Sequence, residues 1–147
     1  PPRSTLFPYT TLFRSADIRR DFPGGWKGDS QNAFNPATRT AEQKEFHDFT
    51  QKVLNWRKSK EVIHTGKTTH YMPKEKVYVY FRYNEKEKVM VVINNNEKEQ
   101  TLDLNRFTES LDGVSSGKDI ISGKDFVVNS KNKLTVSGKS SLILELK

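Results

Sequence analysis

The stretch VYVYFRYNEKEKVMVVI, residues 77–93, decides the fold of this chain. Along 77–83, one set of side chains, Val77, Val79, Phe81 and Tyr83, alternates with a second set, Tyr78, Tyr80 and Arg82. A polar turn follows at 84–86, and a second β-prone run covers 89–93. A period of two residues places successive side chains on opposite faces of a strand. The stretch therefore predicts a β-hairpin.

Further short strands are expected on both sides of this hairpin, separated by Ser-Gly, Asn-Ser and Ser-Gly-Lys turn signals. They are residues 68–72, 101–104, 119–121, 126–128, 133–136 and 141–146. About eight short strands at this spacing predict a mainly β fold, an antiparallel β-sandwich. The expected core consists of Val77, Val79, Phe81, Val89, Val91, Ile93, Leu102, Leu104, Ile120, Leu134, Leu142 and Leu144.

A helical pattern precedes the strands. Thr40 and Gln43 have the spacing of a capping box, in which each side chain accepts a hydrogen bond from the other residue's backbone amide. Apolar side chains then recur at steps of three or four, at Phe46, Phe49, Val53 and Trp56. Burying each aromatic ring is worth about 2 to 3 kcal/mol, so we expect this face to have a partner. The period changes to two after Gly66, which predicts a domain boundary there.

The positive charge of the chain is dispersed. Its 25 basic and 18 acidic residues give a formal charge of +7, and leaving out Arg3 and Arg14 of the unusual N-terminal segment reduces it to +5. The lysines are interleaved with acids, as in residues 74–88. Such alternation is typical of a solvated sheet surface, so no nucleic-acid partner is expected.

Metal sites are not predicted either. The chain has no cysteine, which excludes disulfides and thiolate ligands without deciding the compartment. Its histidines, His47, His64 and His70, lack the spacing of metal ligands, and no cluster rich in Asp and Asn has the spacing of a calcium loop. We therefore expect no metal and no cofactor.

The first fifteen residues form an unusual segment. Within it, STLFPYTTLFRS, residues 4–15, nearly repeats Thr-Leu-Phe without a helical or strand period, and it resembles the in-frame translation of a sequencing adapter. We expect residues 1–15 to be a disordered artefact; a natural tail rich in Pro and Thr is the alternative. The segment lacks the apolar core of a signal peptide or membrane span, so it leaves export and localisation open.

Four motifs in the remaining sequence resemble a known family. They are DIRRDFPGGW at 17–26, NAF at 32–34, LNWR at 54–57 and YVYFRY at 78–83. In this order they are similar to the C-terminal end of a glycoside hydrolase family 13 enzyme, the α-amylase family, of the cyclomaltodextrinase and neopullulanase type. The resemblance covers nearly the whole chain after the N-terminal segment.

The resemblance implies two structural parts. Residues 16–66 would be a remnant of a (β/α)8 catalytic barrel, with the loop after the eighth strand at 17–35 and the eighth helix at 40–58. Residues 67–147 would be the C-terminal all-β sandwich domain. The partner of the aromatic helix face would then be the missing barrel.

The resemblance also implies a chemistry that this chain does not carry. The family hydrolyses α-1,4 or α-1,6 glucosidic bonds with retention, using an Asp nucleophile, a Glu acid/base and a second Asp from motifs at the fourth, fifth and seventh barrel strands. None of those motifs occurs here. We therefore assign no catalytic residue and expect the chain to be inactive and structural, whereas its parent would cleave starch, maltodextrin, cyclodextrin or pullulan.

One segment is expected near a bound sugar in the parent, because loops after barrel strands line the catalytic face. It contributes Arg19, Arg20, Asp21, Phe22 and Trp26. The structural alternative is that the arginines hold Asp21 ionised and that the aromatic rings pack the loop onto the barrel.

A second function class stays open. Tyr78 and Tyr80 lie on one face of the predicted hairpin, where they could stack on glucose rings as in an autonomous carbohydrate-binding β-sandwich module. Packing within the fold is the other interpretation, because alternating tyrosines are common on half-buried strands. The preference among cyclodextrin, pullulan and linear chains, and the oligomeric state, are not specified by these residues.

Overall fold

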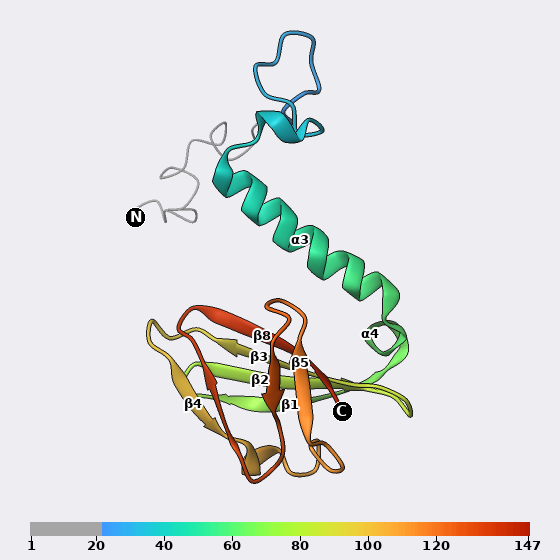
Figure 1. Ribbon diagram of the computed structural model, residues 1–147, viewed down its shortest axis with the longest axis vertical. Coiled ribbons are helices and arrows are strands. Elements are labelled where there is room, and N and C mark those ends of the chain that lie inside the picture. Colours follow the sequence, from blue (N-terminus) through green and yellow to red (C-terminus); the bar gives the residue numbers. More distant parts are fainter. Residues whose placement is uncertain (1–21) are drawn as a thin grey trace, which may run out of the picture. The chain divides into compact units, whose positions relative to one another are not determined.

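Eight strands form two antiparallel sheets in the computed structural model, which describes residues 22–147 (Figure 1). The larger sheet has the order β1 (Lys67–Lys74), β2 (Val77–Tyr83), β3 (Lys88–Asn94), β8 (Ser140–Leu146), β5 (Ser116–Asp119) and β6 (Asp125–Val127). The smaller sheet pairs β4 (Gln100–Asp103) with β7 (Lys133–Val136). This arrangement confirms the predicted mainly β, antiparallel fold.

The predicted hairpin is the β2–β3 pair at the centre of the fold. Its register runs from Val77 opposite Asn94 to Tyr83 opposite Lys88. Asn84 closes the turn, because its side-chain oxygen accepts hydrogen bonds from the backbone amides of Lys86 at 2.9 Å and Glu87 at 2.7 Å. An asparagine in this role mimics a backbone turn, which is why the polar stretch reverses the chain.

Strand β3 is buried on both faces, and this corrects the predicted core. Phe81 pairs with Met90, and residues directly opposite each other share a face. Met90 therefore joins the inner core, which the sequence interpretation missed, while Val89 and Val91 are buried on the outer face of the sheet. Ile93, expected inside, is 41% exposed. Alternation alone did not identify which residues of β3 face the inner core, because a shift of one residue exchanges the two sides of a strand.

The inner core lies between the two sheets. It contains Val77, Val79, Phe81, Met90, Val92, Leu104, Phe107, Leu111, Val128, Leu134, Val136 and Leu144. The short 3-10 helix η2 (Leu104–Phe107) contributes two of these residues from the segment after β4. Three expected core residues, Leu102, Ile120 and Leu142, are only partly buried.

Strand β5 was placed too late by the sequence, at 119–121 instead of Ser116–Asp119. The Ser-Gly pair at its start indicated a turn, yet Gly117 is buried within the strand. A Cβ atom there would lie 3.1 to 3.3 Å from side-chain atoms of Leu146, Leu144 and Val128. The glycine thus marks a close approach to the core.

Within residues 22–147, two α-helices precede the sheets. The longer one, α3 (Ala41–Ser59), begins with the predicted capping box: the Gln43 amide donates to the Thr40 hydroxyl at 3.2 Å, and the Thr40 amide donates to the Gln43 side chain at 3.0 Å. The short helix α4 (Glu61–Thr65) ends at Gly66, as expected. A Cβ atom at Gly66 would lie 2.3 Å from the Val62 carbonyl oxygen, so glycine is required there by close packing.

The contacts divide the chain into two compact units, residues 1–47 and 48–147. The described part of the first unit comprises a loop, the 3-10 turn η1 (Pro36–Thr38) and the start of α3. Asn35 caps η1 by accepting a hydrogen bond from the Ala37 amide at 3.0 Å. The second unit holds the rest of α3, α4 and all eight strands.

Candidate functional site

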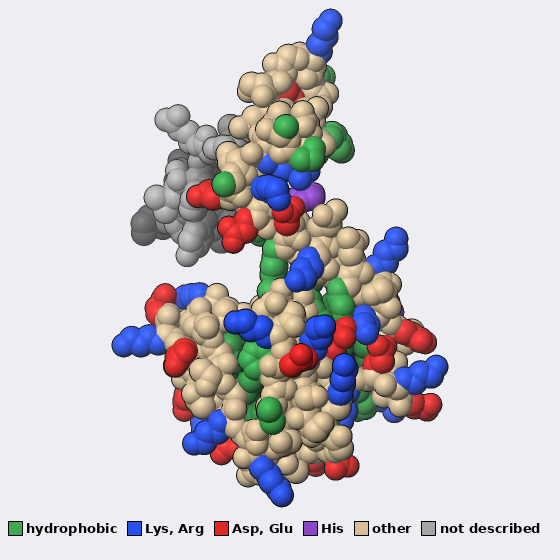
Figure 2. Space-filling model, viewed as in Figure 1, with side chains coloured by type: hydrophobic (Ala, Val, Ile, Leu, Met, Phe, Trp, Pro, Cys, Tyr) green, Lys and Arg blue, Asp and Glu red, His purple; other side chains and the backbone are tan. Residues whose placement is uncertain are grey.

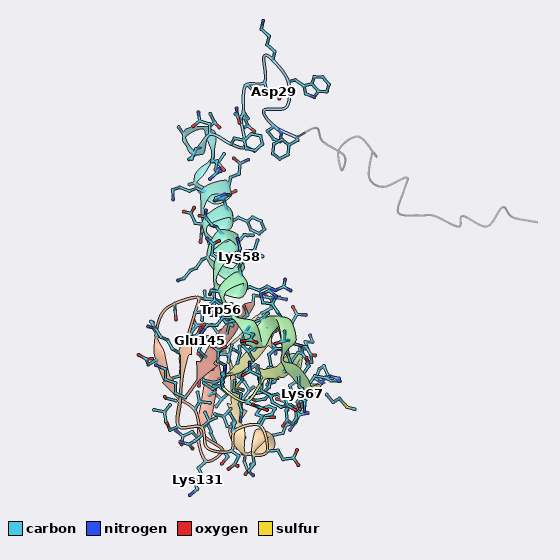
Figure 3. The ribbon with its side chains drawn as sticks, turned by 90° about the vertical axis from the view of Figure 1, so that its right-hand side faces the viewer. Asp29, Trp56, Lys58, Lys67, Lys131 and Glu145 are labelled. Atoms are coloured by element: carbon cyan, nitrogen blue, oxygen red, sulfur yellow. The ribbon has the colours of Figure 1, made fainter. Side chains whose placement is uncertain are left out.

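The loop expected near a bound sugar is closed by a carboxylate, Asp29 (Figure 3). Its side chain accepts hydrogen bonds from the backbone amides of Gly24 at 2.8 Å and Trp26 at 3.2 Å. Gly24 has a φ of +92°, a conformation that glycine adopts without strain. The loop is therefore shaped by a carboxylate that the sequence interpretation did not single out.

Three aromatic rings of this loop are exposed. The exposed fractions are 57% for Phe22, 71% for Trp26 and 76% for Phe34, and the rings of Phe22 and Phe34 lie 5.3 Å apart. Contiguous exposed apolar surface often marks a binding or packing site. The expected neighbours Arg19, Arg20 and Asp21, and the adapter-like residues 1–15, lie outside the described residues.

A polar cluster joins α3 to strand β8 (Figure 3). The Trp56 indole N–H donates to a carboxylate oxygen of Glu145 at 2.5 Å, and the Lys60 ammonium lies 3.1 Å from Glu145 and 2.9 Å from Glu87. Burial acts to raise the pKa of Glu145, but the hydrogen bonds from Trp56 and Lys60 outweigh it and hold the pKa below its usual value. The hydrogen bond to Glu87 raises the pKa of Lys60 against the opposing effect of burial.

Trp56 has its packing partner within this chain, which corrects part of the expectation for the helix face. It lies with Ile63, Tyr80 and Ile143 against the buried cluster of Val62, Val89 and Val91, on the outer face of the larger sheet. Phe46 and Phe49, by contrast, are 73% and 44% exposed. The aromatic stripe thus contains one ring that the sheet covers and two rings that stay accessible.

The two tyrosines proposed for sugar stacking differ in their surroundings. Their rings lie 5.6 Å apart with planes inclined by 33°, and the His70 ring is 6.4 Å from that of Tyr78. Tyr80 packs against the cluster beneath Trp56, and burial raises the pKa of its hydroxyl. Tyr78 belongs to neither apolar cluster, and its side chain is partly exposed.

Asp119 is a buried carboxylate that was not among the predicted site residues. It accepts hydrogen bonds from the Ser122 hydroxyl at 2.6 Å, the Ser122 amide at 2.8 Å and the Ile143 amide at 3.1 Å. Burial acts to raise the pKa of Asp119, but these donors outweigh it and lower the pKa. Asp119 and Glu145 are therefore held ionised as structural anchors, whereas a general acid needs a raised pKa.

Potential metal ligands are dispersed within residues 22–147. No three or more His, Asp or Glu side chains in this range are placed to hold a metal ion. Basic and acidic side chains are interspersed over the face seen in Figure 2. None of the helices in the described range is long and apolar enough to cross a membrane.

Comparison with known families gives a match over most of the strand region. Residues 68–145 match the family described as the cyclomaltodextrinase C-terminal domain. The matched segment is 78 residues long, counted from 68 to 145, and is more than half of the 147-residue chain.

Several solved structures share the fold at low sequence identity. A variant of AmyP in complex with maltotriose matches with a TM-score of 0.66 and 13% identity over 77% of this chain and 23% of that one. An α-amylase from Geobacillus thermoleovorans with acarbose matches with a TM-score of 0.62 and 16% identity over 75% and 25%. The trehalulose synthase MutB from Pseudomonas mesoacidophila matches with a TM-score of 0.54 and 21% identity over 69% and 18%. The chain thus spans a quarter or less of each of these proteins.

Proposed function

The chain belongs to the family of cyclomaltodextrinase C-terminal domains, and from this premise we propose that it is the non-catalytic C-terminal part of an α-glucan hydrolase of the α-amylase family. The family match over residues 68–145 carries this proposal. The carboxylates of Asp119 and Glu145 support it further, because hydrogen bonds and an ion pair within the fold engage both of them. Cleavage with retention would be a property of the parent enzyme.

Residues 16–66 are, in this proposal, the last loop and helix of the parent's catalytic barrel. The exposed rings of Phe46 and Phe49 support the idea that a further apolar surface covers α3. The structural likeness to AmyP also supports it. That likeness covers 77% of the 147 residues, which is more than the 78 residues of the family match, so it extends beyond the strand region. The adapter-like origin of residues 1–15 remains a separate proposal.

The loop aromatics supply the proposed contribution to substrate binding. Phe22 and Trp26 are exposed, as a ring that stacks on a sugar must be. Together with Arg19, Arg20 and Asp21, they would line the sugar-binding face of the parent. A parent of the neopullulanase or cyclomaltodextrinase type would act on pullulan, cyclodextrin or linear maltodextrin. The fold alone does not choose among these substrates, since one architecture hosts many reactions.

An activity assay tests the non-catalytic role. The purified chain is incubated with maltoheptaose, a cyclodextrin and pullulan, and released reducing ends are measured against a commercial α-amylase as the positive control. We expect no release above the buffer control. Turnover proportional to the amount of chain would contradict the proposal.

Tyr78 on β2 favours a second candidate, an autonomous carbohydrate-binding module. Its ring is partly exposed and lies outside both apolar clusters, as a sugar-stacking ring requires, whereas Tyr80 packs with Trp56. Isothermal titration with maltodextrins distinguishes the two candidates. Saturable binding that is lost in Tyr78→Ala and kept in Phe46→Ala would favour the module.

A further inference from the structure

Helix α3 is held to the larger sheet by few contacts. All of its residues, Ala41–Ser59, lie in the described range, and none of them is buried. Its Trp56 ring packs on the apolar cluster of the outer sheet face, and the Lys52 ammonium donates to the Ile121 carbonyl at 2.6 Å. Segments with few buried apolar contacts open locally at a lower free energy than the whole fold. Detachment of α3 should therefore cost less than unfolding of the sheets.

Helix α4, by contrast, is fixed to the same face. Its Val62 is fully buried, and the Arg82 guanidinium donates to the Ile63 carbonyl at 2.8 Å. Between the two helices, Lys60 has an extended backbone with a φ of −108° and a ψ of 105°. Hinges are formed by a few residues at the ends of such elements. Lys60 is thus the point about which α3 can move while α4 stays in place.

Four side chains at this junction, Trp56, Lys60, Glu87 and Glu145, form what we call the Glu145 cluster (Figure 3). The Glu145 carboxylate accepts a hydrogen bond from the Trp56 indole at 2.5 Å and lies 3.1 Å from the Lys60 ammonium. The same ammonium donates to Glu87 at 2.9 Å. Glu145 therefore joins strand β8 both to α3 and to the hinge residue.

The charged groups around Glu145 on the sheet are mainly positive. Lys118 of β5 lies opposite Glu145 in the sheet register, and Lys147 follows β8. Arg82 of β2 lies opposite Val89, which is the β3 neighbour of Glu145. These cations favour the ionised carboxylate.

Protonation of Glu145 would change its two contacts. Its attraction to Lys60 would be lost, and its hydrogen bond from the Trp56 indole would weaken, because hydrogen bonds to an ionised acceptor are about twice as strong as neutral ones. Glu87 would still hold Lys60 at the sheet. The hinge would therefore stay in place while α3 loses its polar attachment.

We propose that the Glu145 cluster is an acid-sensitive switch: when Glu145 is protonated, α3 detaches from the outer face of the larger sheet about Lys60, while α4 and both sheets stay folded. Burial acts to raise the pKa of Glu145, but the hydrogen bonds from Trp56 and Lys60 outweigh it and lower the pKa below its ordinary value of 4.5. Attachment is therefore complete above pH 4.5 and is lost as the pH falls through the lowered pKa. The switch is a property of this chain and does not rest on the proposed function.

Tryptophan fluorescence of the full chain carrying Trp26→Phe tests the switch, because Trp56 is then the only tryptophan. We expect its emission to move to longer wavelength in one step below pH 4.5, as the ring enters water. Two-dimensional NMR follows the sheets in the same samples. At the end of that step, the backbone amide signals of Val92 and Leu134, one in each sheet, should keep their folded positions.

Three variants assign the step. Glu145→Gln keeps an acceptor for the indole but removes the charge, so the step that precedes loss of the sheet signals should be absent. Lys60→Met removes the cation and should move the step to higher pH. Glu97→Gln is the matched control, because Glu97 also pairs with a lysine, Lys139, but is 83% exposed and lies outside the cluster. Its step should be unchanged.

Three outcomes would overturn the proposal. The first is an emission change that coincides with loss of the Val92 and Leu134 signals, or no change before it, since the unit would then unfold as a whole. The second is the same acid step in Glu145→Gln, which would assign the step to another group. The third is an unchanged midpoint in Lys60→Met. If Glu145→Gln does not fold, the order of the two signals and the Lys60→Met midpoint still decide.

Discussion

Substitution of Trp56 by alanine tests how α3 is attached to the sheet. Truncating a fully buried tryptophan costs about 3 to 5 kcal/mol, and a partly buried ring should cost about half of that. The lost indole hydrogen bond to Glu145 adds about 1 kcal/mol, because Lys60 still pairs with the carboxylate. We therefore expect the free energy of unfolding to fall by about 2.5 to 3.5 kcal/mol. For a unit of about 100 residues, the midpoint of thermal unfolding should fall by roughly 10 to 20 °C.

Urea denaturation followed by far-ultraviolet circular dichroism measures this loss, since the substitution removes one of the two tryptophans needed for fluorescence. Phe46→Ala is the matched control, because that ring lies on the same helix and is 73% exposed. Its effect should stay within about 0.5 kcal/mol. Equal effects of the two substitutions would refute the packing of Trp56 on the sheet.

Three further predictions concern the second unit, residues 48–147. Asn94→Leu should lower the free energy of unfolding by about 2 to 3 kcal/mol in urea denaturation, because the buried Asn94 amide donates to three backbone carbonyls that would lose their partner. The pKa values of Asp119 and Glu145 are lowered by folding, so their stabilisation is fully present above their ordinary pKa values and is lost as the pH falls below about 4. Asp119→Asn should flatten the acid limb of a plot of unfolding free energy against pH, and an unchanged limb would contradict the assignment. Gly66→Ala should destabilise the chain by about 1 to 3 kcal/mol in thermal unfolding, because its Cβ would meet the Val62 carbonyl at 2.3 Å; an unchanged midpoint would contradict the close approach.

Local signals predicted the elements that depend on neighbours in the sequence. The Thr40–Gln43 capping box and the alternation along β2 each describe contacts within a few residues, and both were found. The face of β3 was harder to predict, because Val89 and Met90 are both buried, on opposite sides. A strand covered on two faces loses the contrast that alternation needs.

The sequence pattern did not predict contacts between segments that are distant in the chain. Trp56 meets Glu145 across 89 positions, so its place in the helical stripe gave no sign that the sheet would cover it. A cleft beside strand β4 likewise joins residues 74–79 to residues 100–107. The family resemblance supplied the expected domain, whereas these sites required the packing of the sheets.

Sequencing the genomic DNA immediately upstream of the codon for Ala16 tests the central claim most directly. We predict a continuous reading frame that encodes the rest of a (β/α)8 barrel, with an Asp, a Glu and a second Asp at the ends of its fourth, fifth and seventh strands. A frame that lacks these paired acids, or that encodes an unrelated fold, would contradict the descent of this chain from an α-glucan hydrolase.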